Sequence, residues 1–372
     1  MDDESEQKHF RRVLKSFRAY ETYSLNLIEQ KKKYVREVPK EDQELVKKLA
    51  ARLNRSEEAI KTNAQFIGKV LAPKILFSNA NEIGPNSNGA DVGGSNGLSL
   101  SDVDRVRTVL KQIAREWSEA GNLERHQSFQ PLIDVIQRHF GKTPVSDLKN
   151  IRILVPGAGL ARLPWELARL GYTVQGNDFS YYHLLVANYI LNFAHGDAPA
   201  DMNAGNGSTP KSIVYPYIHQ TNNVVREENQ FLAVGVPDVN PRQLPTTGAE
   251  FSMIGGEFVD VYADQNESWD CVCTCFFIDT ARNVVQYIRT IKNLLRPGGI
   301  WANLGPLLYH YADMFNENSI ELTLEEVLQV TADLGLEIIQ NGYRRCAYSS
   351  DQQSMFKVEY DCLFFLARKP VQ

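Results

Sequence analysis

A short apolar segment that runs into a glycine-rich loop limits the folds open to this chain more than any other feature. Residues 151–155 are almost all apolar, Pro156 and Gly157-Ala158-Gly159 follow at once, and a helix is predicted over about 161–170. Gly157 permits a sharp turn, Gly159 lets a ligand approach the backbone, and the helix N-terminus carries a partial positive charge. This order indicates a nucleotide-binding α/β fold, although a plain glycine turn between strand and helix has the same pattern.

The other predicted elements extend this unit into a sheet. Strands are predicted at 151–155, 172–176, within 251–262, at 269–277, 300–304, 336–344 and 356–367, with helices at about 161–170, 180–192, 281–295 and 323–334. The alternation predicts a mostly parallel sheet with helices on both faces, and the last two strands, with no helix between them, predict an antiparallel hairpin. We therefore expect a Rossmann-like α/β domain. Residues 213–250 show no clear period and stay unassigned.

Two regions are predicted, a helical region at 1–145 and the α/β domain at 146–372. Apolar residues within 8–75 recur at three- to four-residue spacing, Ser56 is expected to open a further helix, and Ser101-Asp102 is expected to cap a helix that ends near 121. Another helix is predicted at about 125–140. Segments rich in Asn, Gly and Ser, at about 79–100 and 195–212, are expected to be surface loops.

Composition excludes several classes of protein. The formal net charge of −5 provides no overall basic field for nucleic acid. The sequence also has no run of 18 apolar residues, which a membrane span would need. The five cysteines include no CxxC pair, and their crowding at 271, 273 and 275 is unlike a secreted disulfide framework. We therefore expect no nucleic-acid or membrane partner, no metal, and a reduced compartment, the cytoplasm or the nucleus.

Acidic residues at strand ends favour a nucleoside ligand. Asp178 follows the second strand, where a carboxylate can accept both ribose hydroxyls, although it could instead cap the next helix. Glu257-Phe258 follows the third strand, where the acid could accept the adenine amino group and the ring could pack on the base; the alternative is an ordinary strand-end charge. A dinucleotide GxGxxG motif would need glycine at Arg162. Methyl transfer is therefore favoured over hydride transfer.

Several longer segments resemble the carnosine N-methyltransferase family. They are LKQIAREWSEAGNLER (110–125), ILVPGAGLARLPWELARLGY (153–172), QGNDFS (175–180), WDCVCTCFFIDTARNVVQYI (269–288) and LLRPGGIWANLGPLLYHY (294–311). The resemblance implies a class I methyltransferase fold with S-adenosylmethionine as cofactor. It also implies a histidine-containing dipeptide as substrate, such as carnosine, which is methylated on an imidazole nitrogen to anserine.

The resemblance also assigns site residues. Cofactor contacts fall on Gln112, Arg115, Gly157, Asp178, Glu257, Phe258 and Cys275, and substrate contacts on Asp279, His310 and Tyr360, of which Asp279 and His310 are the catalytic pair. This chain departs from the family at four positions: it has Asp178 for Glu, Glu257 for Asp, Ala161 for Gly, and Val358 for an aromatic residue. The last change concerns the peptide substrate more than the methyl transfer.

Each assigned residue also has a structural interpretation. Gln112 and Arg115 share one helix face and could hold the methionine carboxylate, or the face could simply be solvated. Cys275 and Tyr360 could be core residues, His310 could be structural, and Asp279 could cap a helix that starts near Thr280. These alternatives make the placement of each side chain informative.

The chemistry requires a neutral imidazole nitrogen aimed at the methyl group. We expect Asp279 to accept the N–H of one ring nitrogen, so that the other is free to attack, with His310 orienting the substrate and Tyr360 donating a hydrogen bond. Alternatives are a methyltransferase for a protein histidine or another small imidazole, and a cofactor-binding protein without catalysis. The amphipathic N-terminal helices could also form a homodimer.

Overall fold

The computed structural model describes residues 3–73, 98–194, 211–349 and 351–371. The predicted loops at 79–100 and 195–212 therefore lie almost entirely outside the described residues. Their described ends are regular structure, because helix α4 (Leu100–Trp117) begins at Leu100 and strand β3 (Ser212–Val214) begins at Ser212. Those two boundaries of the predicted loops are wrong by a few residues.

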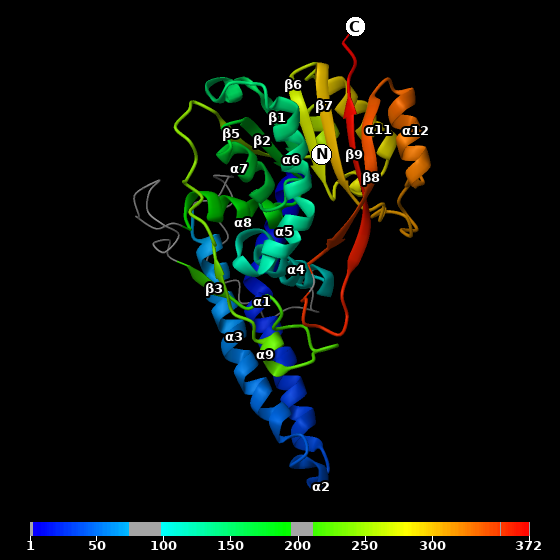
Figure 1. Cartoon of the computed structure of the whole chain (residues 1–372). Helices are drawn as coiled ribbons and strands as arrows, with labels where there is room; N and C mark the ends of the chain where they lie inside the picture. The colour runs from blue at the N-terminus through cyan, green and yellow to red at the C-terminus, as the bar shows by residue number, and fades with distance from the viewer. Residues whose placement is uncertain (1–2, 74–97, 195–210, 350, 372) are drawn as a thin grey trace.

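A seven-stranded sheet forms the centre of the molecule (Figure 1). Its strands, in the spatial order β5-β2-β1-β6-β7-β9-β8, are Phe251–Gly255, Thr173–Asp178, Arg152–Pro156, Trp269–Cys275, Leu295–Gly305, Glu359–Arg368 and Glu337–Ala347. The first five run parallel, whereas β9 is antiparallel to both β7 and β8. The predicted mostly parallel sheet with a C-terminal antiparallel hairpin is confirmed.

Alternate residues of the inner strands supply two separate cores, because successive side chains of a strand point to opposite faces. Ile153 and Val155 join one core, and Leu154 between them joins the other. The first core includes α6 (Gln130–Phe140) and α7 (Arg162–Arg169). The second includes α10 (Phe258–Val261), α11 (Val284–Leu294) and α12 (Leu324–Asp333). The sheet is therefore buried on both faces, as a parallel sheet requires.

The N-terminal helices α1 (Asp3–Glu37) and α3 (Lys47–Leu71) form a hairpin that projects from the body, with α2 (Lys40–Gln43) at its far end (Figure 1). Helix α3 is continuous through Ser56, whose hydroxyl donates to the Arg52 carbonyl at 3.0 Å, so the predicted helix start there is wrong. The N-cap of α4 is Ser99 rather than Ser101, because the Asp102 carboxylate accepts the Ser99 amide at 2.7 Å.

Contacts with residues far away in the sequence fix the conformation of the segment 213–250, for which the sequence predicted no elements. Strands β3 and β4 (Val234–Val236) pair antiparallel, and α9 (Glu227–Gln230) lies between them in the chain. The Asn63 side chain of α3 accepts the Tyr215 amide at 2.7 Å and donates to the Tyr215 carbonyl at 3.0 Å, which fixes this segment to the N-terminal helices. The single helix predicted at 125–140 is two helices, α5 (Asn122–Ser128) and α6.

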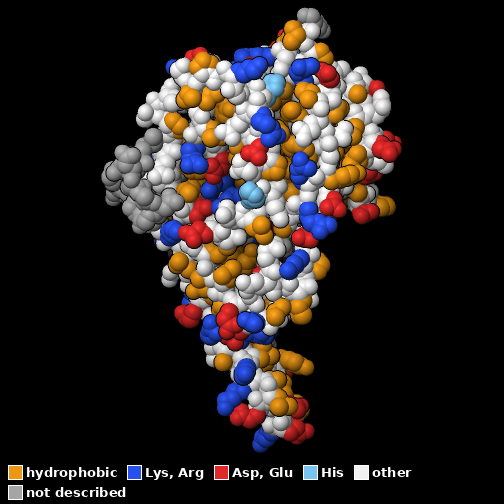
Figure 2. Space-filling model, viewed as in Figure 1, with side chains coloured by type: hydrophobic (Ala, Val, Ile, Leu, Met, Phe, Trp, Pro, Cys, Tyr) orange, Lys and Arg blue, Asp and Glu red, His pale blue; other side chains and the backbone are white. Residues whose placement is uncertain are grey.

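The surface in view carries interspersed charges of both signs (Figure 2). Basic and acidic side chains alternate over the body and along the helical hairpin. Among the described residues, no helix combines the length and apolar character that crossing a membrane requires.

Candidate active site

The glycine-rich loop follows β1 at the carboxyl edge of the sheet. Gly157 has φ +67°, and a Cβ there would lie 2.4 Å from the ring of Phe277. Gly159 has φ +57°, and a Cβ there would lie 2.6 Å from a carboxylate oxygen of Glu116. Both the backbone conformation and the lack of space therefore require glycine at these positions. Ala161 also has a left-handed φ, of 69°, a conformation that favours glycine.

Asp178 stands at the end of β2 and holds the loop in place. Its carboxylate accepts the Gly159 amide at 2.8 Å and the Ser180 amide at 2.8 Å, and His183 Nδ1 lies 3.3 Å away. Burial alone would lower the pKa of His183, but the Asp178 carboxylate beside it raises this pKa overall. The N-cap of helix α8 (Tyr181–Asn192) is Ser180, so Asp178 orders the loop instead of opening that helix.

Helix α4 brings two of the predicted residues, Gln112 and Arg115, against this loop. Both are buried, so the alternative of a solvated helix face is wrong. Gln112 donates to Glu116, whose other carboxylate oxygen accepts the amides of Leu160 at 3.1 Å and Arg162 at 3.3 Å. Burial raises the pKa of Glu116, whereas the Arg115 charge and these amides oppose the rise. The last turns of α4 and the glycine loop are therefore one connected unit.

Arg115 is the buried side chain at this edge whose chemistry best suits an anionic group. Its guanidinium lies over the rings of Phe129, Phe276 and Tyr348, at 5.5, 5.3 and 4.7 Å from their centroids. Its Nε is 3.4 Å from Glu124, yet within the described residues neither Nε nor Nη2 has a hydrogen-bond partner. Buried unpaired donors are costly, and a guanidinium fits a carboxylate well. The chemistry of this position therefore fits the carboxylate of an amino-acid moiety.

Glu257 and Phe258 flank the loop from the other side. Glu257 accepts the amides of Val259 at 2.7 Å and Asp260 at 3.2 Å as the N-cap of α10, and the Tyr287 hydroxyl donates to its second oxygen at 3.1 Å. The Phe258 ring is 2% exposed and packs against other aromatic rings, including Phe277 at 5.4 Å between centroids. The Phe258 ring therefore supports the aromatic side chains around it, Phe277 among them.

Asp279 lies just beyond β6, in the short 3-10 helix η4 (Ile278–Thr280). Its side chain accepts the Leu308 amide at 3.0 Å, and its backbone carbonyl accepts the His310 amide at 3.1 Å. Burial raises the pKa of Asp279 to about 6, although the Leu308 amide and the His310 charge oppose the rise. Asn283, not Asp279, is the N-cap of α11. The His310 side chain is exposed, beside this carboxyl edge.

Aromatic rings join Arg115 to the region of Asp279. The ring of Phe276 lies 4.8 Å from Tyr348 and 6.2 Å from Tyr360, which is half-buried on β9. Burial raises the pKa of Tyr348, Arg115 opposes the rise and Asp279 adds to it, so both charges lie close to this hydroxyl. Cys275 precedes Phe276, and burial raises the pKa of its thiol to about 12.

The structure gathers the ten predicted site residues at one edge of the sheet. Sequence reasoning missed Glu116, Phe276 and Tyr348, which connect the others. Phe276 has φ +54°, a conformation that its residue type does not reveal. Glu116 had a usable signal, its spacing of four residues from Gln112 on a helix. Among the described residues, no group of three or more His, Cys, Asp or Glu side chains is arranged to hold a metal ion.

Comparisons with known proteins identify the family of this chain. The family model described as carnosine N-methyltransferase matches residues 96–371. The carnosine N-methyltransferase of Mus musculus is 37% identical over 99% of this chain and 88% of its own length. The Drosophila melanogaster relative is 37% identical over 100% of this chain and 81% of its own length, and the Schizosaccharomyces pombe relative is 33% identical over 98% and 97%. The chain therefore belongs to the carnosine N-methyltransferase family.

Proposed function

We propose that this chain transfers the methyl group of S-adenosylmethionine to an imidazole nitrogen of carnosine, giving anserine. The observation that carries this proposal is the buried Arg115, whose Nε and Nη2 have no hydrogen-bond partner among the described residues. Its charge and the raised-pKa carboxyl of Asp279 both act on the Tyr348 hydroxyl. The guanidinium of Arg115 suits a carboxylate, and the carboxyl of Asp279 suits an imidazole N–H. Whole-chain similarity to curated carnosine N-methyltransferases supports the substrate.

The cofactor would lie along the carboxyl edge. When bound, S-adenosylmethionine supplies an activated methyl group on a sulfonium. The planar guanidinium of Arg115 would bind the carboxylate of the cofactor, and Gln112 would lie beside that carboxylate. Gly157 and Cys275 would line the rest of the cofactor site. Asp178 would accept the ribose hydroxyls, because a carboxylate has lone pairs beyond the two that its amides occupy. Glu257 would accept from the adenine amino group, and Phe258 would back this wall.

Asp279 would select the reactive form of the substrate. Its carboxylate would accept one ring N–H of neutral imidazole and leave the other nitrogen with a free lone pair directed at the methyl carbon. The new N–C bond would form as the S–CH3 bond breaks, and S-adenosylhomocysteine would leave as a neutral thioether. The ring would become positive, and the nearby buried carboxylate would stabilise that charge. The ring proton then passes to Asp279. Tyr360 would donate a hydrogen bond to the dipeptide, and His310 would orient its polar end.

A turnover assay tests the proposal directly. The purified protein is incubated with S-adenosylmethionine and, separately, carnosine, Gly-His, free histidine and a histidine-containing peptide, and tandem mass spectrometry locates any added methyl group. We expect methylcarnosine as the main product. Methylation of the longer peptide alone would move the substrate class to protein histidine. Binding of S-adenosylhomocysteine without any methylated product would indicate a cofactor-binding protein without this activity.

Three further features belong to the proposal. We infer that residues 1–145 and 146–372 act as two regions that share one cofactor site, because α4 of the first region contacts the loop of the second. The five cysteines are free, which supports a reducing compartment, the cytoplasm or nucleus. A homodimer through the N-terminal helices is supported by the exposure of Tyr34 and Leu45 near the end of the hairpin, at 73% and 80%.

Light scattering tests the dimer. We expect the wild-type mass to be twice that of the chain, and a double variant, Tyr34→Glu with Leu45→Glu, to halve it. A wild-type mass equal to one chain would contradict the proposed assembly.

A further inference from the structure

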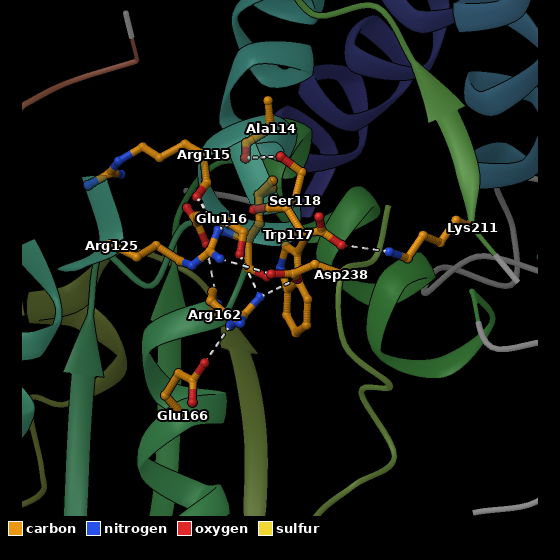
Figure 3. Close-up of polar contacts among 12 residues, drawn as sticks. Ala114, Arg115, Glu116, Trp117, Ser118, Arg125, Arg162, Glu166, Lys211 and Asp238 are labelled. Atoms are coloured by element: carbon orange, nitrogen blue, oxygen red, sulfur yellow. Dashed lines mark hydrogen bonds and ion pairs between the residues drawn. The ribbon is translucent and has the colours of Figure 1, made fainter. Parts of the chain in front are cut away.

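The C-cap of helix α4 is Ser118 rather than glycine, and its last carbonyls are satisfied by Ser118 and by three groups from farther along the chain (Figure 3). The carbonyl acceptors and their donors are Ala114 with Ser118 Oγ at 2.6 Å, Arg115 with Arg125 Nη1 at 2.9 Å, Glu116 with Arg162 Nη1 at 2.9 Å, and Trp117 with the Asp238 amide at 2.9 Å. A helix leaves four such carbonyls unpaired at this end, and cations near them are favoured. Two arginines here do what a C-cap does elsewhere.

One carboxylate holds both of these arginines. Asp238 Oδ2 accepts from Arg125 Nη2 at 2.8 Å, and Asp238 Oδ1 accepts from Arg162 Nη1 at 2.6 Å. The side chains of all three residues are at most 10% exposed. The Arg162 guanidinium is further fixed by Glu166, at 2.8 Å, and by the faces of two tryptophans. Without Asp238, two buried guanidinium groups would face each other with one fewer counter-charge.

This cluster lies directly behind the cofactor residues. The carbonyl that Arg125 holds belongs to Arg115, whose guanidinium presents unpaired donors, and the carbonyl that Arg162 holds belongs to Glu116, whose carboxylate is bonded to the glycine loop. The hydrogen bonds of Asp238 lead through Arg125 to the backbone carbonyl of Arg115, not to its guanidinium. It acts on the ligand through the backbone to which Arg115 is attached.

We propose that Asp238 is a positioning residue for the cofactor, which aligns the end of α4 so that Arg115 and the glycine loop bind S-adenosylmethionine together. This inference rests on the proposed function, and it assigns a role to a segment, between β4 and β5, that carries none of the predicted contacts. It also explains why a buried pair of arginines is present here. Apolar side chains packed on this end would cover the helix terminus but would not fix the rotation of α4 about its own axis.

The test compares two aspartates that each hold an arginine, Asp238 at a buried position and Asp270 at a half-buried one. Asp238→Asn removes the bridging charge with little change of shape. The matched control is Asp270→Asn: Asp270 accepts from Arg296 at 2.9 Å and from the Arg152 amide at 2.8 Å, at the opposite edge of the sheet. Isothermal titration with S-adenosylhomocysteine, thermal unfolding and steady-state kinetics with carnosine are measured for both variants and the wild type.

We expect Asp238→Asn to raise the Kd for S-adenosylhomocysteine and the KM for S-adenosylmethionine by about tenfold. The KM for carnosine, measured at saturating cofactor, should stay within about twofold. Asp270→Asn should lower the unfolding temperature by a smaller amount, because the Asp270–Arg296 pair is more exposed, and it should leave the cofactor Kd unchanged. A purely structural role for Asp238 would lower stability only, with the wild-type Kd, and that result would overturn the proposal.

A second variant covers the case in which Asp238→Asn does not fold. Arg125→Lys keeps the positive charge but cannot span the Arg115 carbonyl and Asp238 at once, because it lacks the planar fork. The same rise in cofactor Kd is expected, and a wild-type Kd would again overturn the proposal. The proposed function stands or falls separately, on whether the wild type binds S-adenosylhomocysteine and methylates carnosine.

Discussion

The cofactor half of the site and the substrate half are built in opposite ways. In the cofactor half, the carboxylates of Glu116, Asp178 and Glu257 each accept two backbone amides, and the glycine loop fits tightly between α4 and Phe277. In the substrate half, Asp279 is buried at an energetic cost, and the side chain of His310 is exposed. Hydrogen bonds within the protein order the cofactor half, whereas the substrate half keeps the Asp279 carboxyl buried, where its ionised form is disfavoured.

This difference indicates how each half tolerates substitution. The carboxylates of Asp178 and Glu257 each accept two backbone amides, so a substitution that removes either carboxylate would leave those amides without their acceptor. Val358 is held through its backbone, because its carbonyl accepts the Tyr348 amide at 3.2 Å. Its side chain can therefore change without loss of that hydrogen bond.

Replacing Asp279 by Asn should have the largest effect on activity. The variant keeps an acceptor for the Leu308 amide but loses the charge that stabilises the developing imidazolium, so we expect kcat to fall by about 100-fold or more. The Kd for S-adenosylhomocysteine should not change, because the cofactor half is intact. Stopped assays with carnosine and calorimetry measure the two quantities. Turnover at the wild-type rate would remove Asp279 from the mechanism.

Stability of the same variant provides the control. Because the folded-state pKa of Asp279 is raised to about 6 from 3.8, ionisation of this group disfavours folding above that range. The penalty at pH 7 is roughly 3 kcal/mol, and it disappears as the pH falls below about 4. Asp279→Asn should therefore be at least as stable as the wild type at pH 7, with the difference lost near pH 4. Strong destabilisation at pH 7 would indicate a structural carboxylate instead.

Arg115→Lys tests the division between the halves. Lysine keeps the charge but loses the planar fork and its stacking, so we expect the Kd for S-adenosylhomocysteine to rise about 30-fold. The kcat at saturating cofactor should change by no more than about threefold. If the KM for carnosine rose and the cofactor Kd did not, Arg115 would belong to the substrate half and the division drawn here would fail.

The pH profile sharpens the description of the substrate half. Asp279 must be ionised and the substrate imidazole neutral, so kcat/KM for carnosine should fall as the pH drops through two ionisations, one near pH 6 and one near about 6.5. Its logarithm should approach a slope of two at low pH. In Asp279→Asn the slope should be one, since only the substrate still titrates. A slope of one in both proteins would separate Asp279 from proton handling.

Ala161→Gly should have the smallest effect, and on stability alone. The left-handed backbone at Ala161, with φ 69°, costs an alanine about 1 kcal/mol, part of which glycine loses again through its freer unfolded chain. We expect a net gain of about 0.5 kcal/mol in the free energy of unfolding, measured by urea titration. A loss of stability would mean that the Ala161 methyl group contributes packing that outweighs this strain.

The sheet was predictable because its signals are local. The apolar runs that became β1, β2 and β6 each end at a carboxyl edge, and Asp178 and Asp279 could be placed there from their position in the chain alone. The segment at 213–250 was not predictable, because contacts such as Asn63 with Tyr215 join positions far apart in sequence. The division of the 125–140 helix depends equally on where α5 and α6 pack.

Within the site, predictability followed the same rule. Gly157 and Gly159 could be picked out from the sequence, because two glycines directly after an apolar run indicate a turn with backbone angles that few other residues tolerate. Glu116 and Tyr348 gain their importance only when α4 lies beside the loop and the β8–β9 hairpin brings its rings to Arg115. The spacing of Glu116 from Gln112 indicates a shared helix face but not the contact with the loop, and nothing near Tyr348 in the chain indicates its contact with Arg115.

The position of α4 has a consequence for any shortened form of this protein. A chain that started at residue 146 would retain all seven strands of the large sheet, and with them the glycine loop and Asp279. It would lack the guanidinium of Arg115 and the carboxylate that fastens the loop from above. If Arg115 binds the cofactor as proposed, a fragment that retains this binding must begin no later than Ser99, the N-cap of α4.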